Sequence, residues 1–362
     1  MKSSFSRHAY SRTACAVMLL AAAAGCGEGA VDSVEPGAPE LLESSAELSV
    51  MTPLARSQNL ATEIVVDGMS VYWVEIPFGS DGKSRIMKRS KSAMSMSLPQ
   101  QVAAEEGSIF HLTADASNLY WLSQTYADAQ FHVTVHRVSK YGGVVTTLPG
   151  FPSQPYALTT DDSHFYVAAG NQIQRVSKWT GARQVVVDLE DAAYINLLVD
   201  ATHVYWLNYR GIFRAPRSGG TPTQLVTETP HAFVLSGNDL YYVPFNSTDL
   251  KRVSKAGGTA TTVLSDFRPS SQWYSRSPEL PFVVSGSDVI WLDAYGSSEG
   301  DQGRVLKASL LTGTTQVIAA DLSGLTNLAV DASYVYWTSL GTFTHIWPPE
   351  HNRDGAILKA LR

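Results

Sequence analysis

Cysteine is almost absent from this chain of 362 residues. Its two cysteines are Cys15 and Cys26, and none follows Cys26. The remainder of the chain therefore has no disulfide and no cysteine ligand for a metal, so a folded domain must be stabilised by its own core. The length is sufficient to bury such a core, either as one large all-β domain or as two average domains.

Long apolar runs and excess positive charge are also lacking. After residue 25 no run of 18 apolar residues occurs, so no later segment is predicted to cross a membrane as a helix. The formal net charge of -6 argues against a nucleic-acid partner. P-loop, dinucleotide-binding and HExxH zinc motifs are missing as well, which gives little reason to expect an enzyme.

The first 25 residues have the pattern of an export signal. Lys2, Arg7 and Arg12 supply positive charge ahead of an apolar stretch, residues 14–24. This stretch is too short for a lasting transmembrane helix, so we expect residues 1–25 to be removed as a signal peptide.

The signal ends in Ala23-Ala24-Gly25-Cys26. Small residues before a cysteine resemble the lipobox of bacterial lipoproteins. That resemblance implies that Cys26 is acylated and becomes the mature N-terminus, anchored in the cell envelope. Gly27 after the cysteine implies the outer membrane as destination. The alternative is ordinary signal cleavage near Ala24, with Cys26 incidental.

Residues 26–47 are acidic and contain no Lys or Arg. Their composition predicts a disordered, solvated tether. The folded domain is then predicted to span residues 48–362. The acidic residues of the tether are Glu28, Asp32, Glu35, Glu40, Glu43 and Glu47.

An internal repeat decides the expected fold. Each copy has an apolar strand, an Asp or Ser at a turn, and then a strand rich in Val, Tyr and Trp. The copies lie 36 to 49 residues apart. They are Asp67 with Val71-Tyr72-Trp73, Asp115 with Leu119-Tyr120-Trp121, Asp161 with Phe165-Tyr166-Val167, Asp200 with Val204-Tyr205-Trp206, Ser236 with Leu240-Tyr241-Tyr242, Ser285 with Val289-Ile290-Trp291, and Asp331 with Val335-Tyr336-Trp337.

A third strand with a basic residue follows each copy, and usually a glycine turn and a short fourth strand. The turn carboxylate can accept backbone amides two residues on, and the glycines permit the positive φ of a hairpin turn. One four-stranded sheet cannot bury both its faces, whereas seven packed radially can. The sequence thus predicts an all-β fold, a seven-bladed β-propeller of four-stranded antiparallel blades.

The seventh unit stops at Arg362, where its third strand ends. Residues 51–56 lie about as far before Asp67 as a fourth strand lies before the turn residue of other units. We therefore expect an N-terminal strand to complete the last blade and close the ring.

The Tyr-Trp core of the repeat, and Tyr336-Trp337-Thr338 above all, resembles the YWTD-type propeller repeats of lipoprotein receptors. It resembles the repeats of bacterial β-propeller lipoproteins still more. The likeness covers about residues 50–362. It departs from the receptor type because Ser339 replaces the motif aspartate and the copies number seven rather than six. The resemblance implies a binding or scaffolding propeller and transfers no catalytic residue.

A candidate ligand site comes from the position four residues before each turn residue. It is polar in four units, as Asn196 in unit four and as Asn327, Glu63 and His111 in the consecutive units seven, one and two, where it lies at the entry of the innermost strand. The same sector has long connections between the second and third strands. These residues could bind a ligand or a divalent cation, or order water. The aromatic residues expected to wall this site are Phe78, Tyr126, Tyr295, Phe343 and Trp347.

Two functional hypotheses remain. The first is an envelope-anchored binding or scaffolding propeller that recognises a protein, peptide or glycan and touches the membrane through its lipid anchor alone. The second is an enzyme of lyase, lactonase or glycosidase type that uses the central pocket. The inner strands are mostly Val, Leu, Ile and Thr, which favours binding, and no cofactor is expected.

Overall fold

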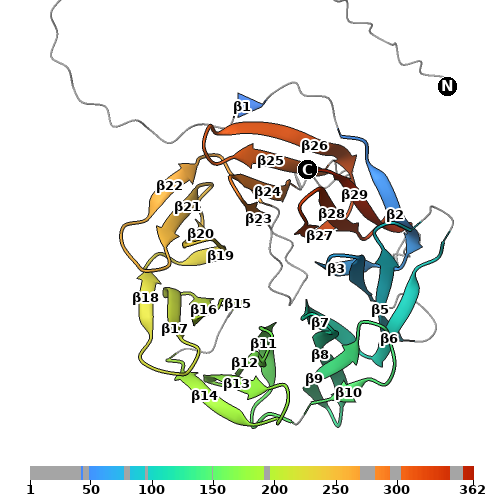
Figure 1. The fold of residues 1–362 in the computed structure, drawn as a ribbon, viewed down its shortest axis with the longest axis vertical. Helices are drawn as coiled ribbons and strands as arrows, with labels where there is room; N and C mark the ends of the chain where they lie inside the picture. The colour runs from blue at the N-terminus through green and yellow to red at the C-terminus, as the bar shows by residue number, and fades with distance from the viewer. Residues whose placement is uncertain are drawn as a thin grey trace, which may run out of the picture. The chain divides into compact units, whose positions relative to one another are not determined.

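The structure is a computed structural model. It describes residues 49–76, 82–93, 97–148, 150–190, 196–269, 282–293, 303–342 and 354–362, and the backbone of Leu42–Glu43. Every regular element in these ranges is a β-strand, and none of them contains a helix able to cross a membrane. The strands form seven antiparallel blades, and the innermost strand of the last blade contacts that of the first, which closes the ring (Figure 1). The seven-bladed propeller predicted from the repeat is confirmed.

Each blade consists of four strands that follow one another from the centre outwards. Blades 1 to 3 are β3 (Ala61–Val66), β4 (Ser70–Glu75), β5 (Lys83–Ser90), β6 (Gln100–Glu106); β7 (Ser108–Ala114), β8 (Asn118–Ala127), β9 (Gln130–Ser139), β10 (Thr146–Thr147); and β11 (Pro155–Thr160), β12 (His164–Ala169), β13 (Gln172–Ser177), β14 (Arg183–Asp188). Blades 4 and 5 are β15 (Asn196–Val199), β16 (His203–Asn208), β17 (Gly211–Pro216), β18 (Thr223–Val226); and β19 (Pro230–Ser236), β20 (Asp239–Pro244), β21 (Leu250–Ser254), β22 (Thr261–Leu264). Blades 6 and 7 are β23 (Phe282–Ser285), β24 (Asp288–Asp293), β25 (Gly303–Ser309), β26 (Thr314–Leu322); and β27 (Leu325–Val330), β28 (Tyr334–Ser339), β29 (Gly355–Leu361), β2 (Thr52–Gln58).

The turn between the first two strands is held by its aspartate. In blade 1, Asp67 Oδ1 accepts the amides of Met69 and Ser70 at 2.9 and 2.8 Å, and Oδ2 accepts the Tyr72 hydroxyl at 3.1 Å. One carboxylate thus fixes both the turn and the tyrosine of the second strand. The same three bonds recur around Asp115, Asp161, Asp200 and Asp331.

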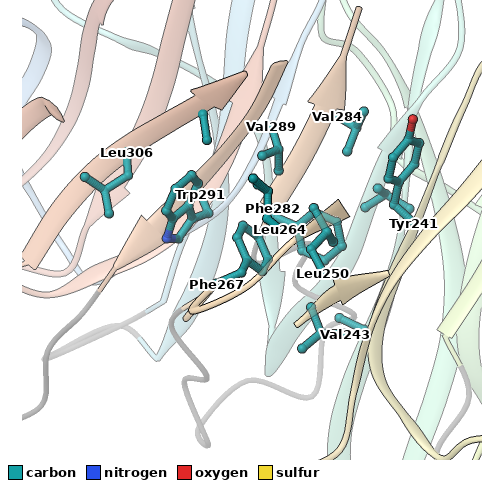
Figure 2. Close-up of a cluster of buried hydrophobic side chains, with 13 residues drawn as sticks. Tyr241, Val243, Leu250, Leu264, Phe267, Phe282, Val284, Val289, Trp291 and Leu306 are labelled. Carbon is teal, nitrogen blue, oxygen red and sulfur yellow. The ribbon is translucent and has the colours of Figure 1, made fainter. Parts of the chain in front are cut away.

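The core lies between the blades. Second strands are buried on both faces, because alternate side chains pack against the blade on either side. In β16, Tyr205 and Leu207 pack toward blade 5, whereas Trp206 packs toward blade 3. Figure 2 shows such an interface, where Tyr241 of blade 5 and Trp291 of blade 6 belong to one buried cluster. The repeated Tyr-Trp pair therefore supplies one large side chain to each neighbour.

Ion pairs join consecutive blades at the turn end. The residue that follows the third strand is basic in six blades, and in five of them it reaches the turn aspartate of the preceding blade. Lys178 Nζ lies 2.6 Å from Asp115 Oδ2 and 4.7 Å from the centre of the Tyr120 ring. The other four pairs are Lys140 with Asp67, Arg217 with Asp161, Lys255 with Asp200, and Lys91 with Asp331.

The N-terminal strand closes the last blade as predicted. β2 pairs antiparallel with β29, from Thr52 opposite Lys359 to Gln58 opposite Gly355. Leu54 and Ala55 are buried in the cluster between blades 7 and 1. Closure therefore joins the two ends of the domain by backbone hydrogen bonds and by the core.

A further strand lies within the segment predicted to be a tether. β1 (Leu42–Glu43) runs parallel to β26, with Leu42 opposite Thr314, so blade 6 has five strands. Ser49 then donates its amide to the Ile318 carbonyl at 3.2 Å. Residues 1–41 and 44–48, including Cys26 and the signal sequence, lie outside the described residues, so those predictions stay predictions.

Candidate binding face

The ring has two different ends. We call the end that carries the turns between first and second strands and between third and fourth strands the turn face. The opposite end, where second strands connect to third strands and blades connect to each other, is the loop face. Propellers of this topology vary most in their connections, so the loop face is the first place to seek a ligand site. Among the described candidates, Tyr126 lies at the loop-face end of β8, and Glu63, His111 and Asn327 lie within the inner strands β3, β7 and β27.

Glu63 and His111, predicted at the entry of adjacent inner strands, lie together two and three residues inside β3 and β7. Glu63 is 6 % exposed, and its two carboxylate oxygens accept the amides of His111 and Leu112 at 2.8 and 2.5 Å. The pairing of β7 with β8 is interrupted between Phe110 and Thr113, so these two amides point away from the ladder. Glu63 therefore ties blade 1 to the bulge of blade 2.

The backbone at this contact is strained. Glu63 and His111 have φ values of 29° and 57°, in the left-handed region that side chains other than glycine rarely adopt. A bulge also interrupts β3 at Glu63. Such conformations persist only where surrounding contacts hold them, and the two bonds to Glu63 are contacts of that kind.

Asn327 occupies the equivalent position in blade 7 and is buried. Its amide donates to Thr338 Oγ1 at 3.0 Å, and its side-chain oxygen accepts the Leu328 amide at 3.2 Å. The neighbouring Thr326 donates to the Ala61 carbonyl of blade 1 at 3.1 Å. The polar residues of the inner strands thus join blades 7, 1 and 2 to one another, and a ligand role for Asn327, Glu63 and His111 stays a prediction.

An aromatic pair projects from blade 2. β8 and β9 pair over ten residues each, and the far end of this hairpin carries Tyr126 opposite Phe131. The two rings lie 5.1 Å apart, and the side chains are 66 % and 48 % exposed. Gln154, at the entrance to blade 3, donates to the Phe131 carbonyl. Tyr126, predicted as part of a wall, is therefore an exposed group on a braced hairpin.

Two buried carboxylates at the loop end were missed from the sequence. Glu75 and Asp293 stand at the same position, the last residue of the second strand, in blades 1 and 6. Burial raises the pKa of Glu75, while a bond from Trp73 and the charge of Arg85 oppose the shift. Asp293 pairs with Arg304 at 2.6 Å. Alignment of the second-strand ends would have found both, and a buried carboxyl with a raised pKa marks a candidate functional group.

The remaining predicted residues lie outside the described residues. They are Phe78, Tyr295, Phe343 and Trp347. Within the described ranges, no three His, Cys, Asp or Glu residues gather as a metal site. His136, which follows the aromatic hairpin on β9, contacts Glu105 of blade 1 at 3.3 Å and Thr134 at 2.6 Å.

No family model matches the chain, and no curated protein matches it. Solved structures do match. A chain of the nidogen/laminin complex has 13 % identity and a TM-score of 0.46, and the match covers 69 % of this chain and 98 % of that one. A putative 6-phosphogluconolactonase from Bacteroides fragilis has 13 % identity and a TM-score of 0.49, over 74 % and 87 % of the two chains.

A prolyl endopeptidase matches with 12 % identity and a TM-score of 0.53, over 84 % of this chain. This chain spans half the length of that peptidase. At such identities a match shows a common fold and no common activity. The seven-bladed ring follows from the strand order of this chain itself, and the likeness of its Tyr-Trp repeats to YWTD-type propellers stays a resemblance of sequence.

Proposed function

We propose that this chain is an envelope-anchored binding propeller that recognises a protein, peptide or glycan at its loop face. The observation that carries the proposal is the exposed aromatic pair Tyr126 and Phe131 on the hairpin of β8 and β9. Aromatic side chains held in place by a rigid strand pair are efficient binding anchors, because they bury large areas and lose little conformational freedom.

The buried polar residues have a supporting role in this proposal. Both carboxylate oxygens of Glu63 accept amides from the bulge of β7. β7 pairs with β8, the strand whose hairpin with β9 carries the aromatic pair. Glu63 therefore positions the hairpin, while Tyr126 and Phe131 contact the ligand. A preorganised site of this kind avoids the cost of ordering the hairpin on binding.

The anchor is the second part of the proposal. A lipid on Cys26 would hold the domain at a bacterial envelope, in agreement with the export-like pattern of residues 1–25. We expect Cys26→Ala to move the protein from the membrane fraction to the soluble fraction, measured by fractionation and immunoblotting. An unchanged distribution would contradict the lipid anchor but would not affect the binding role proposed for the loop face.

The binding role is tested by photo-crosslinking in envelope extracts. The double variant Tyr126→Ser/Phe131→Ser should lose most of the crosslinked ligand. The matched control is Tyr209→Ser/Phe245→Ser, which removes two exposed aromatics from the loop ends of blades 4 and 5. The control should keep its ligand, and equal recovery with both double variants would refute the proposed site.

A further inference from the structure

Large apolar side chains stand exposed at the turn face. They occur at turns or strand ends in blades 6, 7, 1, 2 and 3, which are consecutive around the ring. The equivalent turns of blades 4 and 5 carry Thr202, Ser218, Asn238 and Ala256 instead. The exposed residues are Leu311 (80 %), Leu361 (58 %), Met69 (75 %), Tyr141 (89 %) and Trp179 (83 %). Among the described residues, five consecutive blades thus present a large exposed apolar side chain on one face, and apolar groups gathered in this way indicate an interaction surface.

The same face carries more positive than negative charge. The six turn cations are matched by the five turn aspartates and Asp288, and the third strand adds at least one further Lys or Arg near the turn in every blade, against Asp162 and Asp239 as further carboxylates. Lys88 donates to the carbonyl of Lys140 at 3.0 Å, and Lys359 to that of Lys91 at 3.1 Å, so these charges meet carbonyls rather than carboxylates. The seven cations are Lys88, Arg137, Arg175, Arg214, Arg252, Lys307 and Lys359. This excess of cations occurs in a chain whose formal net charge is -6.

The direction of β1 gives an independent indication. β26 leaves the turn of blade 6 at Thr314 and runs toward the loop face. β1 is parallel to it, with Leu42 opposite Thr314. The chain therefore enters the folded domain at the turn face, beside Leu311, and only 15 residues lie between Leu42 and Cys26.

We propose that the turn face lies on the surface of a phospholipid bilayer with anionic headgroups. Trp179 and Tyr141 enter the interfacial region, where amphipathic aromatic rings are favoured, and the third-strand cations lie at the depth of the phosphates. The lipid chain of the proposed function and this face act together, since one lipid chain alone anchors weakly. The loop face, with Tyr126 and Phe131, then points away from the membrane toward its ligand.

Site-directed spin labelling tests this orientation. Cys15 belongs to the predicted signal and Cys26 is the predicted acylation site, so an introduced cysteine is the one free thiol expected in the mature chain. The purified full chain carries the nitroxide at Trp179→Cys or, as the matched control, at Tyr209→Cys on the loop face. It is reconstituted into phosphatidylcholine vesicles with and without roughly 30 % phosphatidylglycerol. Collision with oxygen, which enters lipid, and with a water-soluble nickel chelate is measured.

The label at position 179 should meet oxygen several-fold more, and nickel several-fold less, than the label at 209, and the contrast should weaken without the anionic lipid. Equal accessibility at both positions would overturn the proposal. Shielding of position 179 in native membranes but not in protein-free vesicles would assign this face to a protein partner and also overturn it. If Cys26 carries no lipid, it is a second free thiol, so the two labels are then placed in a Cys26→Ala background. That protein purifies without detergent and is mixed with the same vesicles. Binding through position 179 then supports the inference although the anchor fails, and no binding overturns it.

Discussion

At the scale of single residues, the turn aspartate does most to define a blade. Asp115 accepts two amides and the Tyr120 hydroxyl from its own blade and the Lys178 ammonium from the next. Donors therefore surround this carboxylate, and replacing any one of them leaves a partly buried charge with one hydrogen bond fewer. Among these ion pairs, the basic residue should contribute most to the free energy of unfolding where the pair is most buried. Removing one partner there leaves the other charge buried without compensation.

Lys178→Met is the sharpest test of this contact. The Lys178 and Asp115 side chains are 4 % and 9 % exposed. We expect the variant to lose about 3 kcal/mol of unfolding free energy, measured by urea denaturation. Lys251→Met is the control, because Lys251 pairs with the half-exposed Glu228 and should cost at most about 1 kcal/mol. Equal losses in the two variants would show that the blade contact is not special.

The turn aspartates also predict an acid transition. Burial raises the pKa of Asp67, but the Lys140 bond and the amides of Met69 and Ser70 outweigh it and hold the pKa at about 2. The pKa of Asp115 is also about 2, where burial is outweighed by Lys178 and the turn amides. A carboxyl with a lowered folded-state pKa stabilises the fold above its unfolded value of 3.8 and ceases to do so as pH falls through 2.

We therefore expect the urea midpoint to stay level from pH 7 to about pH 5 and to fall steadily between about pH 4 and pH 2. Asp115→Asn should start lower and decline less steeply over the same range, since it removes one of the titrating groups. A decline of the same steepness in the variant would mean that other carboxyls cause the acid transition.

At the scale of the element, blades 5 and 6 show how the interblade contact can be replaced. Blade 5 has Ser236 at the turn, and the residue of blade 6 that would pair with it is Leu310. Both charges are thus missing together, and no charge is left without its partner. At the next interface, Arg362 of blade 7 donates to Ser285 Oγ of blade 6 at 2.8 Å and lies 3.5 Å from Asp288 of the same blade.

The missing pair of blade 5 can be installed. We expect Ser236→Asp alone and Leu310→Lys alone to be destabilising, because each adds one unmatched charge and Leu310 also packs against the core between blades 5 and 6. The double variant should recover this loss with a coupling free energy of about 1 kcal/mol, obtained from a double-mutant cycle of urea midpoints. Additive effects would contradict the pairing rule.

At the scale of the whole molecule, closure of the ring decides stability. β2 supplies the outer strand of blade 7 and buries Leu54 and Ala55 against blade 1. Without it, β29 would be an open edge and the core between the last and first blades would be exposed. Repeat arrays owe their stability to contacts between neighbours, so an incomplete blade weakens the interfaces on either side of it.

Truncation tests the closure. A chain that starts at Leu60 lacks β2, and we expect it to melt several degrees lower than the mature domain or to aggregate. A chain that starts at Glu47 lacks the two residues of β1 but keeps β2 and Ser49, and it should melt close to the mature domain because the ring stays closed. Equal melting temperatures of the two chains in scanning calorimetry would show that the strand is dispensable.

The sequence by itself determined the number of blades, the order of strands within each and the closing strand. These follow from local rules, since turn chemistry and alternating burial repeat with a fixed period in the residues themselves. It also placed Glu63, His111 and Asn327 on neighbouring inner strands, although each lies two or three residues inside its strand rather than at the start.

Only the tertiary structure decided what those residues contact. Glu63 accepts the His111 and Leu112 amides because a bulge turns these amides out of the β7–β8 ladder. The presence of a polar residue at one position does not predict such a bulge. The pairing of each turn cation with the preceding blade, the parallel course of β1 and the apolar sector of the turn face arise between segments far apart in the chain. A repeat reveals what each blade is made of, whereas contacts between blades depend on how the units are rotated and stacked in space.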